Sequence, residues 1–220
     1  MPRVLRSSYV LAIVVCLLAI ALAYPVYAQQ KPKPAAPQAA AAKAPSAQAA
    51  AAEKAMMDAM MKAATPGENH KLLASLNGNW NFVNKFWMDP AAPPSESTGT
   101  LTRSSILGGR YFQGTYKGVM SGMPFEGRGF DAYDNVAKQF VSSWMDNMGT
   151  GLMVMTGRYN AATKTITYTG QAPDLMNPGK TYKMRQLIRV ESADRFVTEF
   201  YETRGAKEVK TMEIVATRQK

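Results

Sequence analysis

Apolar and polar residues alternate in short runs from Gly78 to Arg218, and residues typical of turns separate these runs. The pattern predicts ten β-strands, at residues 80–88, 98–106, 110–118, 125–133, 139–146, 151–159, 165–172, 181–191, 195–202 and 208–218. Because no connection is long enough for a crossover helix, each strand should pair antiparallel with its sequence neighbour. The sequence therefore predicts an all-β fold, an antiparallel up-and-down closed barrel of about ten strands over residues 77–220.

The two-residue period also predicts which side chains point into the barrel. The inward set comprises Trp80, Phe82, Asn84, Phe86 and Met88 on the first strand, Tyr182, Met184, Gln186, Ile188 and Val190 on the eighth, and Met212, Ile214, Ala216 and Arg218 on the last. The same alternation leaves Val83 and Trp87 outside, together with Thr211, Glu213 and Thr217. These assignments place mainly apolar and aromatic side chains in the interior.

The strand over residues 195–202 admits two registers. If Glu191 pairs with Arg195, the phenylalanines Phe196 and Phe200 point inward and Glu199 lies in water. A shift of one residue would bury Glu199, and a buried carboxylate needs a partner and has a raised pKa. The turn at residues 192–194 favours the first register.

Two glycines lie within the predicted strand 125–133. Gly127 and Gly129 flank Arg128, but no helix follows them, so the spacing is not a dinucleotide-binding motif. We expect these glycines to allow a bend or a bulge as the sheet curls closed.

Two short helices are predicted over residues 53–76, ahead of the barrel. Residues 53–64 form the first, with four methionines on one face, and Thr65 and Glu68 form a capping box for the second, over residues 66–75. His70 lies among polar neighbours on the second helix and is expected in solvent. Residues 29–52 consist almost entirely of Ala, Pro, Gln and Lys, which predicts a disordered linker.

The N-terminus has the pattern of a secretory signal peptide over residues 1–28. Two arginines precede an apolar run over residues 9–23, and the small residues ending at Ala28 fit a cleavage site. This run is short for a membrane-spanning helix, which needs about 20 apolar residues. We therefore expect a periplasmic or secreted protein with no transmembrane span after cleavage.

The chain is basic, with 26 Lys and Arg against 16 Asp and Glu and a net charge of +10. The basic residues are spread along the strands without a dense cluster, which argues against nucleic-acid binding. They fit attraction to an anionic envelope surface, or simple solubility.

The single cysteine, Cys16, lies in the signal peptide, and the single histidine, His70, has no metal-binding neighbours in the sequence. We therefore expect no disulfide, no metal and no cofactor.

The start and end of the predicted barrel resemble the lipocalin-type, or calycin, family. The triplet Gly78-Asn79-Trp80 follows a short helix and opens the first strand, and Arg218 closes the last one. The resemblance implies that Trp80 plugs one end of the barrel and that Arg218 packs across its ring. Haem-binding relatives hold iron through a histidine on a late strand, which this chain lacks, so haem is disfavoured.

A second resemblance covers residues 56–218. The segments ILGGRY (106–111), GMPFEG (122–127), SWMD (143–146), MGTG (148–151) and KTMEI (210–214) are similar to a secreted bacterial family of unknown function. This family has a lipocalin-like fold and no established activity, so the resemblance implies a fold and no substrate.

The interior side chains either line a ligand site or fill a solid core. The candidate ligand-binding residues are Phe82, Phe86, Tyr116, Trp144, Tyr168, Tyr182 and Gln186. Aromatic walls with a few hydroxyl and amide groups suit a small hydrophobic or amphipathic molecule, and ten strands enclose more space than eight. The strand number favours a cavity, and we take ligand binding as the leading function.

Two other functions stay open. A non-enzymatic envelope interaction module would use the barrel as a scaffold, and its contacts with a partner would be the Met-rich helix, an exposed Trp87 and the basic surface. An enzyme would need carboxylates such as Asp131, Asp146 or Glu199 as general acid or base. Serine catalysis is excluded because no serine has a histidine partner in the sequence. We therefore expect no enzymatic activity. A cavity with two ionisable residues within hydrogen-bond reach would favour the enzyme.

Overall fold

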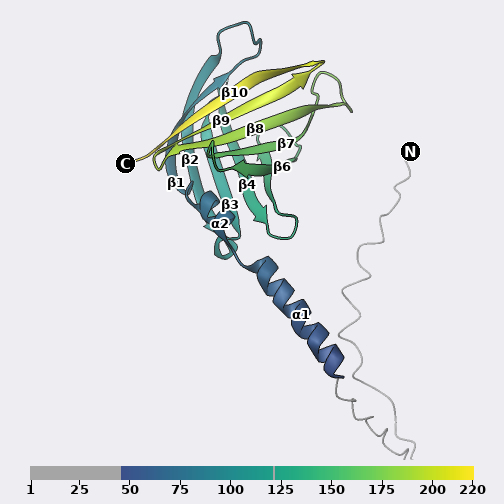
Figure 1. Ribbon diagram of the computed structural model, residues 1–220. Helices are drawn as coiled ribbons and strands as arrows, with labels where there is room; N and C mark the ends of the chain where they lie inside the picture. The colour runs from purple at the N-terminus through teal and green to yellow at the C-terminus, as the bar shows by residue number, and fades with distance from the viewer. Residues whose placement is uncertain (1–45, 121) are drawn as a thin grey trace, which may run out of the picture. The chain divides into compact units, whose positions relative to one another are not determined.

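The computed structural model describes residues 46–120 and 122–220 and contains two α-helices, a short 3-10 helix and ten strands (Figure 1). The helices are α1 (Ala47–Ala64), α2 (Glu68–Ala74) and η1 (Leu107–Gly109). The strands are β1 (Gly78–Phe86), β2 (Ser95–Ile106), β3 (Tyr111–Met120), β4 (Met123–Asp134), β5 (Gln139–Asp146), β6 (Met153–Asn160), β7 (Thr165–Pro173), β8 (Thr181–Ser192), β9 (Arg195–Arg204) and β10 (Lys207–Arg218). The signal peptide predicted over residues 1–28 lies outside the described residues, as does the linker up to residue 45.

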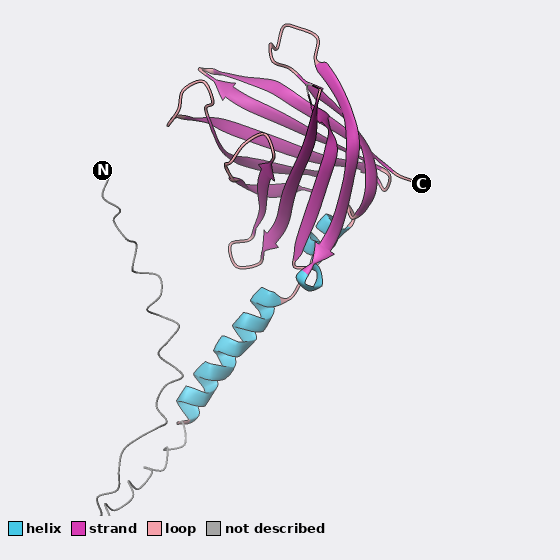
Figure 2. Cartoon of the chain, turned by 180° about the vertical axis from the view of Figure 1, so that it is seen from behind, coloured by secondary structure: helices cyan, strands magenta, loops and turns pink. Residues whose placement is uncertain are grey.

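The ten strands form one closed antiparallel barrel, as the sequence predicts (Figure 2). Each strand pairs with its neighbours in the chain, and β1 pairs with β10 from Trp80 opposite Arg218 to Phe86 opposite Met212. All the predicted strands are present and differ from the prediction only at their ends. Because the strands run up and down in turn, one end of the barrel carries α2 and the other carries the longer loops between strands (Figure 1).

The helix α1 begins at Ala47 rather than at residue 53. Ser46 accepts a hydrogen bond from the amide of Ala49 at 3.2 Å and so caps the helix. The alanines that follow have the highest helix propensity of all residues. The linker prediction is therefore wrong for residues 47–52.

The cap of α2 also differs from the prediction. The helix starts after Gly67, and the Nδ1 atom of His70 accepts the amide hydrogen of Gly67 at 3.0 Å, so Thr65 and Glu68 form no capping box. His70 is only 5% exposed and lies edge-on to the ring of Tyr133 on β4. The prediction of a solvated histidine is wrong because α2 packs its His70 side against the barrel.

The end of the barrel that carries α2 is closed by a packed core. Trp80 lies edge-to-face with Phe196, and Leu73 and Leu76 are buried in the same cluster. The Arg218 guanidinium lies 4.0 Å from the centre of the Trp80 ring and donates to the carbonyl oxygen of Asn77 at 2.7 Å. This is the arrangement that the lipocalin resemblance implies.

Gly78 makes room for this plug. Its φ of +127° is one that L side chains rarely adopt, and a Cβ atom there would overlap the Arg218 guanidinium. The close approach of β1 to the arginine therefore requires glycine at this position.

Two register shifts change where side chains point. Between β8 and β9, Ser192 rather than Glu191 lies opposite Arg195, and the shift keeps Phe196 opposite Val190 in the interior. Between β9 and β10, a shift at Thr211 leaves it unpaired and turns its side chain into the barrel. The prediction that Thr211 faces outward is therefore wrong because a bulge interrupts the alternation.

Glu199 lies on the outer face of the barrel but not in water. Its side chain is 14% exposed and forms ion pairs with Lys210 at 2.7 Å and Arg189 at 3.6 Å. The predicted direction holds, and the predicted solvation does not, because long basic side chains from the neighbouring strands cover the carboxylate.

The end of β1 differs from the prediction as well. Met88 lies beyond the last residue of the strand and is 82% exposed, so it does not point inward. Trp87 is half-buried, and Lys210 lies over its ring at 5.5 Å, so the tryptophan is not the exposed contact that the sequence predicts.

Candidate functional site

A cavity of about 810 Å³ occupies the half of the barrel farthest from Trp80. Side chains from all ten strands line it, and so do residues of the loops after β5 and β7, such as Leu152 and Leu175. Because these loops lie at the end opposite α2, this end of the barrel is hollow and the other end is filled. The two interpretations of the interior that the sequence leaves open, a solid core and a ligand cavity, each apply to one half.

Five of the candidate ligand-binding residues line the cavity: Phe82, Phe86, Tyr116, Trp144 and Gln186. The other two do not. Tyr168 is fully buried in the core cluster, and Tyr182 is half-buried, with its hydroxyl 3.4 Å from a carboxylate oxygen of Glu202. Alternation along a strand predicts the inward direction but not the height in the barrel, so it cannot separate residues that line a cavity from residues that fill a core.

Arg103 and Asp131 form a buried ion pair in the cavity wall. Their Nη2 and Oδ2 atoms are 2.8 Å apart, and the two side chains are 4% and 7% exposed. Burial opposes the charge on Arg103, but the Asp131 carboxylate outweighs it, and the pKa of Arg103 lies above its ordinary value. The Arg103 side chain therefore stays charged although it is buried.

Two tyrosines lie in the electrostatic field of this pair. Burial raises the pKa of Tyr116, and burial together with the Asp131 carboxylate raises the pKa of Tyr168 well above its ordinary value. Both hydroxyls are therefore neutral at any physiological pH. Among the described residues, the buried Tyr168 hydroxyl and the buried Arg103 Nε atom form no hydrogen bond.

Arg103 was not predicted as a cavity residue, and Asp131 was named only as a candidate carboxylate for an enzyme. Alternation along the strand could have found Arg103, because it lies on the same face of β2 as the apolar residue Leu101. In the structure Leu101 is fully buried. Other polar groups in the wall are Asn84, Ser142, Thr198, Glu202 and Thr211. Thr211 could not be found from alternation, because the bulge that turns it inward has no clear sequence signature.

An aromatic cluster forms one wall of the cavity. The Trp144 ring lies edge-on to Tyr116 at 5.1 Å and stacks with Phe125 at 6.3 Å between ring centroids. Its indole Nε1 atom donates to the Asp146 Oδ2 atom at 2.6 Å. The Asp146 Oδ1 atom accepts the amide hydrogen of Met148 at 2.9 Å, so this carboxylate fixes both the ring and the loop that follows β5.

Gly127 and Gly129 provide the space for the Trp144 ring. A Cβ atom at Gly127 would overlap the ring, and one at Gly129 would lie 3.4 Å from it. β4 pairs with β3 and β5 without a register shift, so the predicted bulge at these glycines is absent. The glycines leave room for the Trp144 ring, and the prediction of a bend there stays untested.

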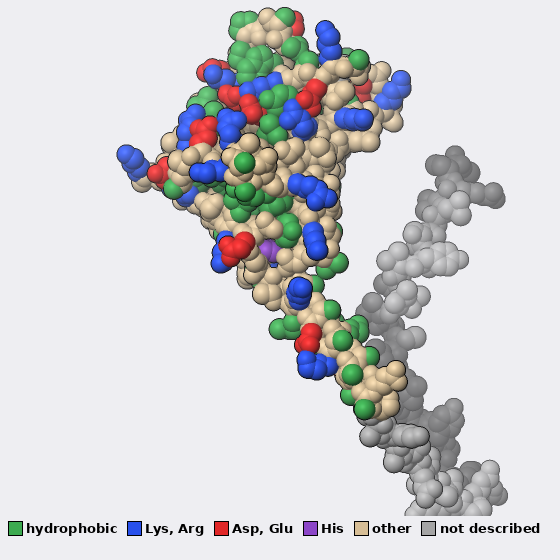
Figure 3. Space-filling view, viewed as in Figure 1, with side chains coloured by type: hydrophobic (Ala, Val, Ile, Leu, Met, Phe, Trp, Pro, Cys, Tyr) green, Lys and Arg blue, Asp and Glu red, His purple; other side chains and the backbone are tan. Residues whose placement is uncertain are grey.

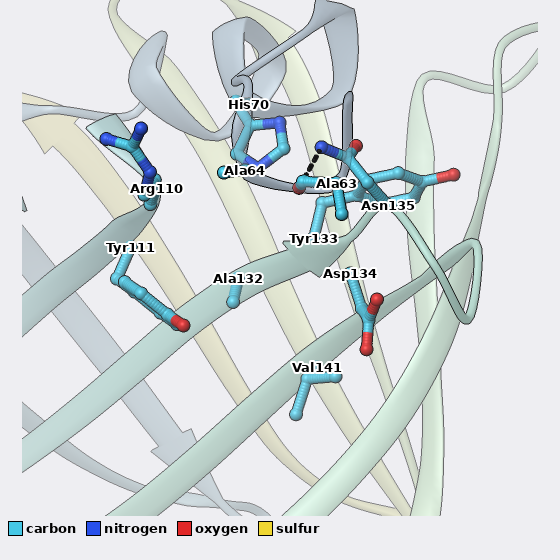
Figure 4. Close-up of a pocket in the computed structure, with 10 residues that line it drawn as sticks. All are labelled: Ala63, Ala64, His70, Arg110, Tyr111, Ala132, Tyr133, Asp134, Asn135 and Val141. Carbon is cyan, nitrogen blue, oxygen red and sulfur yellow. Dashed lines mark hydrogen bonds between the residues drawn. The ribbon is translucent and has the colours of Figure 1, made fainter. Parts of the chain in front are cut away.

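A second pocket, of about 450 Å³, lies outside the barrel beside α2 (Figure 4). His70, Arg110 and Tyr133 line it, and the side chain of Asn135 donates to the carbonyl oxygen of Ala63 at 2.9 Å. Burial lowers the pKa of His70. Within residues 46–120 and 122–220, no three His, Cys, Asp or Glu side chains lie close enough to hold a metal ion.

The Arg103–Asp131 pair brings two ionisable side chains within hydrogen-bond reach in the cavity, which is the condition set above for an enzyme. The guanidinium, however, keeps its proton at all relevant pH values, so it cannot serve as a base. Such a pair positions a ligand or supports the fold more readily than it transfers a proton.

Comparisons with known proteins agree with the fold. The family described as "Protein of unknown function (DUF1579)" matches residues 65–218. The crystal structure of Rv2717c from M. tuberculosis matches 71% of this chain and 100% of its own, with 16% identity and a TM-score of 0.52. At this identity the likeness shows the fold alone.

Two further solved structures, both of them engineered barrels, are also similar. A de novo designed fluorescence-activating β-barrel is 15% identical, with a TM-score of 0.39 over 67% of this chain and 96% of its own. A redesigned β-barrel is 15% identical, with a TM-score of 0.36 over 68% of this chain and 96% of its own. A search of curated proteins finds no match.

Proposed function

We propose that this chain, which belongs to the DUF1579 family of proteins of unknown function, binds a small apolar or amphipathic molecule inside its barrel. The observation that carries the proposal is the cavity of about 810 Å³ at one end of the barrel. Small-molecule sites have volumes of roughly 300–1,000 Å³ and combine apolar walls with a few polar groups. This cavity fits both criteria, and binding requires neither catalysis nor a cofactor.

The cavity walls contain both apolar and polar residues, and the two kinds contribute differently to binding. Phe82, Trp144 and Met184 supply apolar surface, whose burial by a ligand is favourable. Gln186 and the Arg103–Asp131 pair are buried and polar, so they favour a ligand whose polar atoms lie near them.

The test is binding of N-phenyl-1-naphthylamine, a neutral dye that fluoresces in apolar surroundings. The substitution Met184→Trp adds bulk to the cavity and should weaken binding by about tenfold or more. Lys183→Trp, one residue away on the outer face, is the matched control and should leave binding unchanged. Absence of dye binding to the unaltered protein, or equal binding to both variants, would contradict the proposal.

We also propose that the protein is periplasmic or secreted. The support is the signal-peptide pattern of residues 1–28, which lie outside the described part of the chain. Among the described helices, none has the length and apolar character that crossing a membrane requires. N-terminal sequencing of protein purified from the native host should begin at Gln29, and retention of Met1 would overturn the proposal.

A second candidate function, contact with a protein partner, is supported by α1. This helix has no buried residue, and hydrophobic side chains are visible along it in Figure 3. Met56, Met57, Met60 and Met61 are 54–67% exposed. Exposed methionines form an adaptable contact surface. Deletion of residues 47–64 should abolish capture of a partner and leave the thermal unfolding of the barrel unchanged, whereas unaltered capture would exclude this role for α1.

A further inference from the structure

We infer that the occupant of the cavity is an organic cation with an apolar tail, a long-chain amine or quaternary ammonium compound. The inference rests on the proposed binding function and adds the charge of the ligand to it. It is carried by one wall of the cavity, made of Trp144, Tyr116, Phe125 and Asp146, which we call the aromatic–acidic wall.

Asp146 is a carboxylate in the cavity wall whose hydrogen bonds come from uncharged donors. Its two oxygens accept the Trp144 indole N–H and the Met148 amide N–H. No described lysine or arginine forms an ion pair with it. These two donors fix the orientation of the carboxylate, and no neighbouring cation neutralises its negative charge.

The cavity holds no described cation to balance Asp146. Arg103 is the one lysine or arginine among the described residues that line it, and its charge is already matched by Asp131 at 2.8 Å. The chain as a whole is strongly basic, with a net charge of +10, so the acidic character belongs to this interior and not to the protein at large. An anionic head group would meet unfavourable charge there, and a cationic one would meet favourable charge.

The rings of the aromatic–acidic wall favour a cation independently of Asp146. Trp144, Tyr116 and Phe125 all line the cavity, and the centre of the Trp144 ring lies 5.1 Å from that of Tyr116 and 6.3 Å from that of Phe125. Aromatic faces attract a cation through their quadrupole, and tryptophan does so most strongly. A group of such rings beside a carboxylate is the chemistry that recognises quaternary ammonium ligands.

The experiment compares four ligands with equal ten-carbon tails: decyltrimethylammonium, decylamine, decanol and decanoate. Each displaces N-phenyl-1-naphthylamine from the unaltered protein, below the concentration at which it forms micelles. We expect the two cations to compete at concentrations about tenfold lower than decanoate, with decanol between them. Asp146→Asn and Trp144→Leu should each reduce this preference, measured as the ratio of the cation and decanoate competing concentrations, several-fold.

Glu96→Gln is the matched control, because Glu96 is an exposed carboxylate at the same end of the barrel that does not line the cavity. It should leave the preference unchanged. If the dye binds but decanoate competes as well as the cations, or if Asp146→Asn and Glu96→Gln behave alike, the charge inference fails and the binding function stands. If neither the dye nor any of the four ligands binds, the binding function itself fails. Should a variant not fold, the four-ligand comparison on the unaltered protein still decides.

Discussion

Individual residues in this protein hold positions that their chemistry alone would disfavour. Arg103 and Asp131 are charged and buried, and each is tolerated because the other lies 2.8 Å away. His70 is buried, which lowers its pKa, and its Nδ1 atom accepts the amide hydrogen of Gly67. Both arrangements make stability depend on one contact, and each leads to a test.

Breaking the buried ion pair should be more damaging than removing it whole. Arg103→Met leaves the Asp131 carboxylate buried without its partner and should lower the free energy of unfolding by about 3–5 kcal/mol. The double variant Arg103→Met with Asp131→Leu removes both charges and should recover part of this loss. Urea denaturation of the two single variants and the double variant measures the coupling, and strictly additive losses would show that the pair is not coupled.

Protonation of His70 should destabilise the fold. Burial lowers its pKa below the ordinary 6.5, although a backbone contact with Tyr133 raises it in part. The histidine therefore contributes stability that is fully present above pH 6.5 and is lost as the pH falls through the lower pKa of the folded state. Urea denaturation between pH 7.5 and pH 5 should show this loss, and His70→Gln should show a smaller one. An equal slope for both proteins would argue against a role for His70.

At the scale of elements, the strands are shaped by what packs against them. β4 carries Gly127 and Gly129 because the Trp144 ring of β5 occupies the space where their side chains would be. The bulge on β10 brings the side chain of Thr211 to the cavity wall without interrupting the closure of the barrel. Where the backbone of one strand approaches a large side chain of its neighbour, only a glycine fits without displacing that side chain.

Gly127→Ala should destabilise the barrel. The added methyl group would overlap the Trp144 ring, and overpacking of this kind costs about 1–3 kcal/mol. Gly149→Ala is the control, since a Cβ atom there meets no heavy atom within 4 Å. Thermal unfolding should separate the two variants, and equal midpoints would show that the ring moves aside freely.

The whole molecule combines a filled end and a hollow end in one barrel. Trp80, Phe196 and the leucines of the α2 region pack the closed end, while the cavity occupies the other. Basic and acidic side chains intermix on the visible outer face, with no single charged patch (Figure 3). Stability and binding are therefore expected to reside at opposite ends of the molecule.

This separation can be tested at the plug. Arg218→Met removes the contact with the Trp80 ring and the hydrogen bonds to the carbonyl oxygens of Asn77 and Ala193. It should lower the free energy of unfolding by about 1–3 kcal/mol. Binding of N-phenyl-1-naphthylamine should not change, because the two sites share no residue. Loss of dye binding by a folded variant would show that the two ends are coupled.

The sequence by itself determined the strand number and the antiparallel order of the strands, because both depend on local signals. Alternation sets the direction of side chains such as Phe82 and Gln186, and turn residues set the length of the connections. The plug of Trp80 and Arg218 was expected only from the resemblance to lipocalins. The prediction of the helix starts was less accurate. The start of α1 depends on the cap that Ser46 forms, and the start of α2 depends on the hydrogen bond between the Gly67 amide and His70.

Tertiary structure alone decided which inward side chains line a cavity and which fill a core. Trp144 and Tyr168 have the same predicted direction, yet the first lines the cavity and the second is buried beneath it. The pairing of Arg103 with Asp131 and the inward turn of Thr211 also depend on contacts between strands. The physical reason is that alternation encodes a direction within one strand, whereas height in the barrel, charge pairing and bulges are set by the neighbouring strands.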